Sequence, residues 1–231
     1  MSDRPIRVLL LRHGQSEWNA RGLWQGMADS PLSALGREQA DIIAARLAAL
    51  PYDFTSVWTS DLSRAHATAA TIADALGVPE VFIDANLREA HAGAWQGLTQ
   101  DDIRRDWPGY LDAHMRPPDF ELYESVVTRA LVALGNISTH RSRHGSRHGS
   151  TETGRVIVVA HSGLIRSLLR HVDGSDPRIP NLGGVWIDVA DTARGVAVEV
   201  VEVFDPADID ADVFNSTPRE LLGEEPGAPT A

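Results

Sequence analysis

The chain of 231 residues is 43% hydrophobic and 23% charged, which is the composition of a folded domain rather than of a disordered segment. It contains neither cysteine nor lysine, so all 21 basic residues are arginines. These absences exclude disulfides, thiolate metal sites, P-loop lysines and Schiff-base catalysis. The net charge of −11 disfavours a nucleic-acid partner, because contact with a phosphate backbone requires a cationic surface.

The length of the chain suits a single domain, which we assign to residues 1–216, with the Pro- and Gly-rich residues 217–231 as a frayed tail. No apolar run is long enough to span a bilayer, and the N-terminal residues lack the apolar region of a signal peptide. We therefore expect a cytoplasmic protein with no membrane partner. The sequence leaves the oligomeric state open and allows a homodimer.

Strands and helices are predicted to alternate along the chain. The apolar run at residues 6–11 is typical of a strand that is buried on both faces. Further strands are expected at residues 57–59, 81–84, 155–160, 185–189 and 196–204, and helices at residues 33–50, 61–76, 122–137 and 162–170. This alternation predicts an α/β three-layer sandwich, in which helices flank a mostly parallel central sheet.

Residues 140–151 (HRSRHGSRHGST) contain a doubled RHGS and no apolar side chain. This composition predicts a flexible surface loop that tolerates shortening. A histidine-rich metal site is the alternative, but the segment has no acidic partners before Thr151 and its histidines are widely spaced. We therefore expect no metal site here.

Four basic side chains are placed where predicted strands end. Arg12 and His13 follow the first strand, Arg64 lies in the first turn after the second strand, and His161 follows the strand at 155–160. Ligands of parallel sheets collect at the carboxyl ends of the strands. Arginine forks match phosphate oxygens in pairs, and a neutral imidazole can attack phosphorus. A single histidine at a strand end is usually structural, but four such residues at one edge favour a phosphate site without a metal.

Four segments of the chain resemble the motifs of the histidine phosphatase superfamily, also called phosphoglycerate mutase-like: LLLRHGQSEWN, SDLSRAHATA, LREAHAGAWQG and VVAHSGLIRSLL. The resemblance implies that the fold is phosphoglycerate mutase-like and that His13 is the nucleophile. It also implies that Arg12, Arg64 and His161 hold the phosphate. By the same resemblance, the residues that join them or line the site are Asn19, Gln15, Ser16, Gln25 and Gly26.

Glu89 in LREAHAG matches the general acid of the family, which protonates the leaving oxygen. Because such an acid must carry a proton, we expect an apolar wall such as Trp95 beside its carboxyl group. Ser162 stands where the family usually has glycine, and its hydroxyl is a candidate donor to the phosphate. Asn181 in IPNLGG is a further candidate for the pocket.

The chain departs from the mutase branch of the family. That branch resembles Glu-Arg-His-Tyr-Gly after the acid, whereas this sequence reads Glu89-Ala90-His91-Ala92-Gly93, and the lysine of that branch is absent. We therefore expect a histidine acid phosphatase-type phosphomonoesterase, which hydrolyses a small phosphorylated metabolite through a phosphohistidine without a cofactor or metal. LREAHAGAWQGLT also resembles the phosphatases that act on glucosyl-3-phosphoglycerate.

Three alternatives stay open. The first is a cofactor-dependent phosphoglycerate mutase, which would isomerise phosphoglycerate instead of releasing phosphate. The second is a non-catalytic phosphate-binding module, although such a module could lose His13 or Glu89 and this chain has both. The third is a serine hydrolase built on Ser162, which is disfavoured because Ala160 and Leu164 stand where a nucleophile elbow needs glycine.

Overall fold

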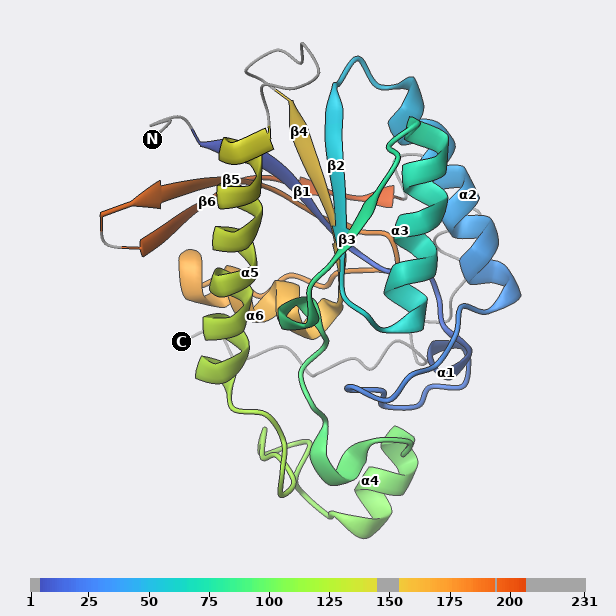
Figure 1. Ribbon diagram of the computed structural model, residues 1–231. Coiled ribbons are helices and arrows are strands. Elements are labelled where there is room, and N and C mark those ends of the chain that lie inside the picture. The colour runs from blue at the N-terminus through green and yellow to red at the C-terminus, as the bar shows by residue number, and fades with distance from the viewer. Residues whose placement is uncertain (1–4, 145–153, 194, 207–231) are drawn as a thin grey trace.

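The computed structural model describes residues 5–144, 154–193 and 195–206. The chain folds into a sheet with helices on both faces (Figure 1). In chain order the elements are β1 (Ile6–Arg12), α1 (Glu17–Ala20), α2 (Ala34–Ala49), β2 (Phe54–Thr59), α3 (Ser63–Leu76), β3 (Val81–Ile83), η1 (Ala85–Leu87), η2 (Gly93–Trp95), α4 (Gln100–Asp106), α5 (Tyr123–His144), β4 (Arg155–Ala160), α6 (Ser162–Val172), β5 (Gly184–Thr192) and β6 (Gly195–Phe204). The predicted strands and helices lie within a few residues of these bounds, except at the end of α5, whereas α1, η1, η2 and α4 were not predicted.

The strand order in the sheet is β3-β2-β4-β1-β5-β6. Strands β3, β2, β4 and β1 are parallel to one another, β5 is antiparallel to β1, and β6 is antiparallel to β5. In the centre, Leu10 of β1 lies opposite Val158 of β4 on one side and Val185 of β5 on the other. The prediction of a mostly parallel α/β sheet is confirmed.

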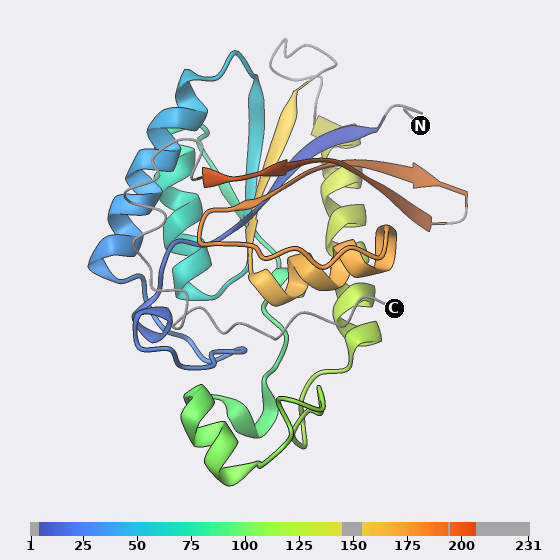
Figure 2. The ribbon, with the colours of Figure 1, turned by 180° about the vertical axis from the view of Figure 1, so that it is seen from behind.

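Side chains of β1 alternate between two apolar layers. Leu9 and Leu11 pack in the layer that contains α2 and α3, while Val8 and Leu10 pack in the layer that contains α5 and α6. The two views of the ribbon show these helix pairs on opposite sides of the sheet (Figures 1 and 2). Because both faces are covered, the central strands read as unbroken apolar runs.

The parallel strands all end at the same edge of the sheet. Residues 84–122, with α4, extend beyond this edge between β3 and α5 (Figure 1). Residues 13–33, with α1, lie at the same end of the molecule (Figures 1 and 2). The segments that follow β1, β2, β3 and β4 therefore meet at one place, where the predicted site residues are carried.

The prediction of a surface loop at residues 140–151 is wrong for its first part. Helix α5 continues to His144, and the ring of His140 lies 4.4 Å from that of Phe82 and 5.4 Å from that of Trp58. A helix needs apolar contacts on one face only, and the imidazole supplies them in place of an aliphatic side chain. Residues 145–153 and the predicted tail at 217–231 lie outside the described residues.

In the part of the chain that the structure describes, no helix combines the length and the apolar character needed to cross a membrane.

Candidate active site

His13 follows β1 directly and is 2% exposed. Its Nδ1 atom lies 2.6 Å from the carbonyl oxygen of Gly14. Because a carbonyl can only accept, Nδ1 carries the hydrogen and Nε2 keeps its lone pair. Burial, and then the charges of Arg64 and Arg12, hold the pKa of His13 well below its usual value. The ring is therefore neutral, and its unprotonated Nε2 has the form that a nucleophile needs.

Arg64, in the first turn of α3, is fully buried beside His13. Its Nε donates to His13 Nε2 at 3.2 Å, while Nη1 and Nη2 donate to the carbonyls of Ala28 and Gly26 at 2.8 and 2.9 Å. Gly26 has a φ of 52°, and a Cβ there would lie 2.5 Å from the backbone nitrogen of Ala92, so a larger residue would displace this carbonyl. Burial lowers the pKa of Arg64 to about 10, which leaves it cationic at neutral pH.

Arg12, the last residue of β1, is 8% exposed and is held by the loop that precedes β5. Its Nη1 donates to the carbonyl of Ile179 at 2.9 Å. Burial lowers the pKa of Arg12 to about 10, with Glu89 acting in the opposite direction. Its Nε is buried and has no hydrogen-bond partner. A buried donor left open in this way is suited to an anionic ligand.

His161 follows β4 and is fully buried, with its ring centre 5.1 Å from that of His13. Its Nε2 lies 2.8 Å from Ser60 Oγ, and its Nδ1 is buried without a partner. Burial, and then Arg64, hold the pKa of His161 well below its usual value. The ring is therefore a neutral hydrogen-bonding group with one nitrogen still open.

Glu89 lies across the N-terminus of α6. Its Oε2 accepts from the backbone N–H of Gly163 at 3.0 Å, and its Oε1 accepts from Leu164 at 3.1 Å and from Ala90 at 2.9 Å. His161 is the N-cap of α6 and gives no side-chain cap, so the carboxylate of Glu89 satisfies two of the free N–H groups of this helix. This carboxylate is also close enough to Arg12 and Arg64 to oppose, in part, the lowering of their pKa values by burial.

That Trp95 forms an apolar wall beside Glu89 stays a prediction. Its ring packs edge-to-face on Trp24 at 5.0 Å and on Phe120 at 6.2 Å, whereas the hydrogen-bond partners of Glu89 are backbone N–H groups. Trp95 is wholly buried. Backbone hydrogen bonds of Trp24 with Gly97 and Leu98 attach residues 92–98 to the loop before Gly26. The surroundings of this carboxyl are therefore more polar than the sequence suggested.

Polar side chains link the loop after His13 to the loop before β5. Ser16 caps α1 and receives the N–H of Asn19, and its hydroxyl donates to Gln25 Oε1 at 2.7 Å. Asn181 Nδ2 donates to the carbonyl of His13 at 3.0 Å and to Asn19 Oδ1 at 3.4 Å. Asn19 and Asn181 thus lie beside His13, as expected for pocket residues, while their contacts with a phosphate stay a prediction.

Gln15 is turned toward helix α2. Its Oε1 accepts from the hydroxyl of Ser33, the N-cap of α2, and its backbone N–H donates to Gln39 Oε1. Ser162 is the first residue of α6 and is half-buried. The roles of Gln15 and Ser162 toward a phosphate stay predictions.

Ser60 and Arg129 are the two residues of this region that sequence reasoning missed. Ser60 follows β2 directly, so the rule that singled out Arg64 applies to it equally. Arg129 lies in the middle of α5, where no strand end or motif marks it. Its five hydrogen bonds, three to carbonyls of residues 86–89 and two to the side chain of Glu121, depend on the tertiary fold alone.

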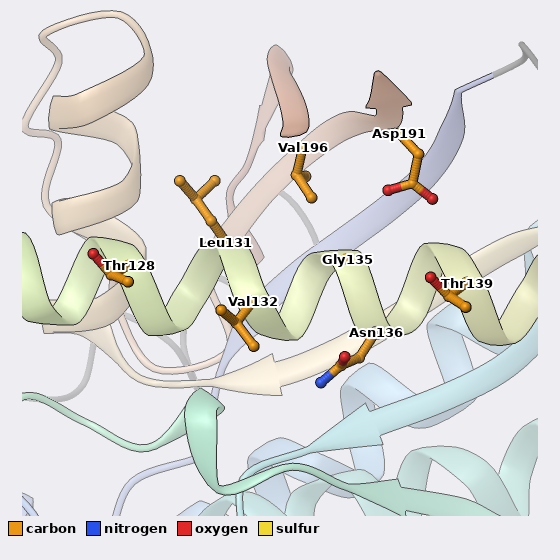
Figure 3. A pocket seen from close by; sticks show the side chains of 8 residues that line it. All are labelled: Thr128, Leu131, Val132, Gly135, Asn136, Thr139, Asp191 and Val196. Atoms are coloured by element: carbon orange, nitrogen blue, oxygen red, sulfur yellow. The ribbon is translucent and has the colours of Figure 1, made fainter. Parts of the chain in front are cut away.

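A depression beside α5 differs from the candidate active site in the chemistry of its lining (Figure 3). Figure 3 shows it between α5 and the β5–β6 hairpin, and the side chains that line it belong to Thr128, Leu131, Val132, Gly135, Asn136, Thr139, Asp191 and Val196. This lining has no arginine or histidine, and its one charged residue is an aspartate. It therefore does not provide what a phosphate ester requires.

Among the described residues, no group of three histidine, aspartate or glutamate side chains is arranged to hold a metal ion. The positive charge at the carboxyl edge of the sheet comes instead from the two buried guanidinium groups.

Comparison with known proteins agrees with this site. A model of the histidine phosphatase superfamily (branch 1) matches residues 8–185. A glucosyl-3-phosphoglycerate phosphatase of Mycolicibacterium vanbaalenii is 38% identical over 201 residues, covering 83% of this chain and 87% of the relative. A 2,3-bisphosphoglycerate-dependent phosphoglycerate mutase of Methylobacterium sp. is 34% identical over 215 residues, covering 88% and 98%. The structure of a mycobacterial glucosyl-3-phosphoglycerate phosphatase with VO3 is similar, with a TM-score of 0.70 at 28% identity, covering 84% and 97%.

A neutral, buried histidine between two arginines at the carboxyl edge of an α/β sheet defines an enzyme of phosphate esters. The family model spans more than half of the sequence, and the chain belongs to the histidine phosphatase superfamily. Within that family it is a phosphomonoesterase, and the mutase alternative has less support from the relatives.

Proposed function

We propose that the enzyme hydrolyses its phosphate ester in two steps through His13. In the first step, Nε2 of His13 attacks phosphorus, the bond from phosphorus to the ester oxygen breaks, and Glu89 gives that oxygen a proton. In the second step, water attacks the phosphohistidine, the P–N bond breaks, and Glu89 takes a proton from the water. The observation that carries this proposal is the unprotonated Nε2 of His13, which accepts from Arg64 Nε at 3.2 Å and so lies beside a cationic group that can also hold the phosphate.

The two arginines would supply the charge that a metal supplies in other phosphatases. Arg12 Nε and His161 Nδ1 are buried and open, so both can donate to phosphate oxygens without losing another partner. We infer that turnover is metal-independent and, because His13 stays unprotonated below neutral pH, that it persists in mild acid, as in an acid phosphatase. Activity that is lost in EDTA and restored by magnesium or zinc would contradict this inference.

We propose a sugar-linked phosphoglycerate as the substrate, with glucosyl-3-phosphoglycerate as the first compound to test. Support comes from the phosphatase of Mycolicibacterium vanbaalenii, which has that name and is 38% identical to this chain. A mutase that is 34% identical is the competing precedent. The sequence Ala90-His91-Ala92 after the acid and the absence of lysine favour hydrolysis over transfer between two oxygens of one substrate.

The test is the release of inorganic phosphate from glucosyl-3-phosphoglycerate, 3-phosphoglycerate and p-nitrophenyl phosphate by the purified enzyme. We expect the highest kcat/KM for the glucosylated ester and none of this turnover in a His13→Ala variant. The same enzyme, incubated with 3-phosphoglycerate and 2,3-bisphosphoglycerate, should form no more than trace 2-phosphoglycerate. Rapid isomerisation with little phosphate release would identify a mutase instead.

A further inference from the structure

Arg129 of α5 uses all five of its N–H donors, three on backbone carbonyls of residues 86–89 and two on the carboxylate of Glu121. Nε and Nη2 donate to Glu121 Oε1 and Oε2 at 2.8 and 3.0 Å. Nη2 also donates to the backbone carbonyl of Glu89 at 3.0 Å. Nη1 donates to the carbonyls of Asn86 and Arg88, at 2.9 Å for the former. One guanidinium thus holds three carbonyls of residues 86–89.

Glu121 extends this attachment to the other side of Glu89. Its Oε2 accepts the N–H of His91 at 3.0 Å, and its own N–H donates to the carbonyl of His91 at 2.9 Å. The side chains of Arg129 and Glu121 are only 14% and 15% exposed, so water competes weakly for their bonds. Residues 86–91 are therefore fixed to α5 both before and after the carboxyl-bearing residue.

Three other contacts order this segment: Leu87 packs in the apolar core, Arg88 pairs with Asp61, and the side chain of Glu89 accepts backbone N–H groups of α6. Residues 85–87 form one turn of 3₁₀ helix, and no strand follows before α4. Helix α5, in contrast, packs through Val126, Ala130 and Ala133 into the apolar layer under the sheet. Because Arg129 is anchored in that helix, its guanidinium holds the backbone of residues 86–89 in place.

We propose that Arg129, together with Glu121, is a positioning residue that sets the carboxyl group of Glu89 against the leaving oxygen. The inference rests on the proposed function only in that Glu89 acts as the acid. A proton donor must lie within hydrogen-bond reach of the oxygen that it serves, so a shift of the loop lowers the rate even when the carboxyl is still present.

Arg129 also contributes a charge, which is one of the causes that lower the pKa of His161. Lysine at this position keeps that charge but offers three donors from one nitrogen instead of a planar fork of five. The variant Arg129→Lys therefore separates the two roles. It should change the position of Glu89 and leave the electrostatics of His161 largely as they are.

The experiment compares kcat/KM for an alkyl ester, glycerol 3-phosphate, with kcat/KM for p-nitrophenyl phosphate, whose phenolate leaves without a proton. For Arg129→Lys we expect a loss of about 10- to 100-fold on the alkyl ester and less than about threefold on the aryl ester. Glu121→Gln removes the charge from the same pair and should show the same selectivity. The matched control is Arg7→Lys, which alters the bidentate pair of Arg7 with Asp188 between β1 and β5 and should change neither rate.

Glu89→Gln serves as the reference background. If Arg129 acts through Glu89, Arg129→Lys added to Glu89→Gln should cause no further loss on the alkyl ester. Additive losses, or equal losses on the two substrates in both Arg129→Lys and Glu121→Gln, would overturn the positioning role. Equal losses on the two substrates in Glu89→Gln itself would instead refute Glu89 as the acid, which is a separate result.

Discussion

The hydroxyl oxygen of Ser60 lies 2.8 Å from Nε2 of His161, and both groups are fully buried. Ser60 Oγ also receives the backbone N–H of Leu62 at 3.4 Å, which leaves its own hydrogen available for the imidazole. A histidine that accepts at Nε2 carries its hydrogen on Nδ1 when it is neutral. When Ser60 donates to Nε2, the open Nδ1 of His161 is a donor, which is the form that a phosphate oxygen requires.

Ser60→Ala should weaken the preference of His161 for the tautomer with its hydrogen on Nδ1, without removing any group that touches the ester. Loss of one neutral hydrogen bond is worth about 0.5–1.5 kcal/mol, so we expect kcat/KM to fall by about 2- to 10-fold. Vanadate, which mimics the phosphoryl group in the transition state of its transfer, should bind more weakly by a similar factor. Steady-state kinetics and vanadate inhibition measure both quantities.

Ser56→Ala is the control for Ser60→Ala, because Ser56 is a buried serine near the start of β2, the strand that Ser60 follows. It should leave kcat/KM unchanged. A second check uses His161→Asn, which removes the ring on which Ser60 acts. If Ser60→Ala lowers kcat/KM as strongly in the His161→Asn background as in the wild type, then Ser60 does not act through His161.

Gly163→Ala should displace the carboxyl group of Glu89, the proposed acid. A Cβ at position 163 would lie 2.5 Å from Glu89 Oε1, so the carboxyl must move. The displaced carboxyl would no longer satisfy two N–H groups at the start of α6, which opposes the gain in helix propensity from alanine. We expect turnover of alkyl phosphates to fall more than turnover of p-nitrophenyl phosphate.

Gly135→Ala in α5 controls for the added methyl group, since its Cβ meets only a valine side chain at 3.1 Å. This variant should retain both activities. Equal rates of Gly163→Ala and wild type on the alkyl ester would show that the contact between Glu89 and α6 is not maintained during turnover.

The two buried histidines should make stability depend on pH. Their pKa values are lowered on folding, so below the pKa of the unfolded chain, about 6.5, the unfolded state binds more protons than the folded state. Stability is then fully present above pH 6.5 and is lost as the pH falls toward the folded pKa values. Each histidine contributes a slope of up to about 1.4 kcal/mol per pH unit in this window.

Urea unfolding in phosphate-free buffer between pH 7.5 and 5.5 measures this slope. His161→Asn should flatten the curve relative to wild type, because the variant lacks one of the two groups that resist protonation. Parallel curves for wild type and His161→Asn would contradict the burial of a neutral His161 in the folded state.

His140→Ala should lower the free energy of unfolding, because the ring of His140 packs on Phe82 and Trp58. Aromatic contacts of this kind contribute about 0.5–1.5 kcal/mol beyond the area that they bury. His66→Ala on the exposed side of α3 is the matched control and should cost less. Equal stabilities of the two variants in denaturant titrations would show that His140 is dispensable.

Regular elements were predictable because their signal is local. The strand predicted at residues 155–160 is β4 with the same bounds, and the helix predicted at 33–50 is α2 within one residue at each end. Once the strands are placed, the parallel order carries Arg12, His13, Arg64 and His161 to one edge, and the structure brings these four side chains together.

Contacts across long separations could not be predicted in this way. Glu89 reaches α6 over 74 residues and Arg129 reaches Glu89 over 40, through a segment with little regular structure. The packing of His140 depends likewise on Phe82, which no periodic pattern connects to it. Hydrophobic periodicity reports which face of an element is buried, but not which polar group satisfies which backbone donor.

Trapping the covalent intermediate tests the central claim most directly. The enzyme is mixed with excess p-nitrophenyl phosphate, quenched within milliseconds at alkaline pH, and digested for mass spectrometry, because a phosphohistidine does not survive acid. The account predicts a phosphate on His13 that appears at the rate of the initial burst and is absent from His13→Ala. Phosphate on His161, on Ser162 or on a carboxylate during fast turnover would contradict it.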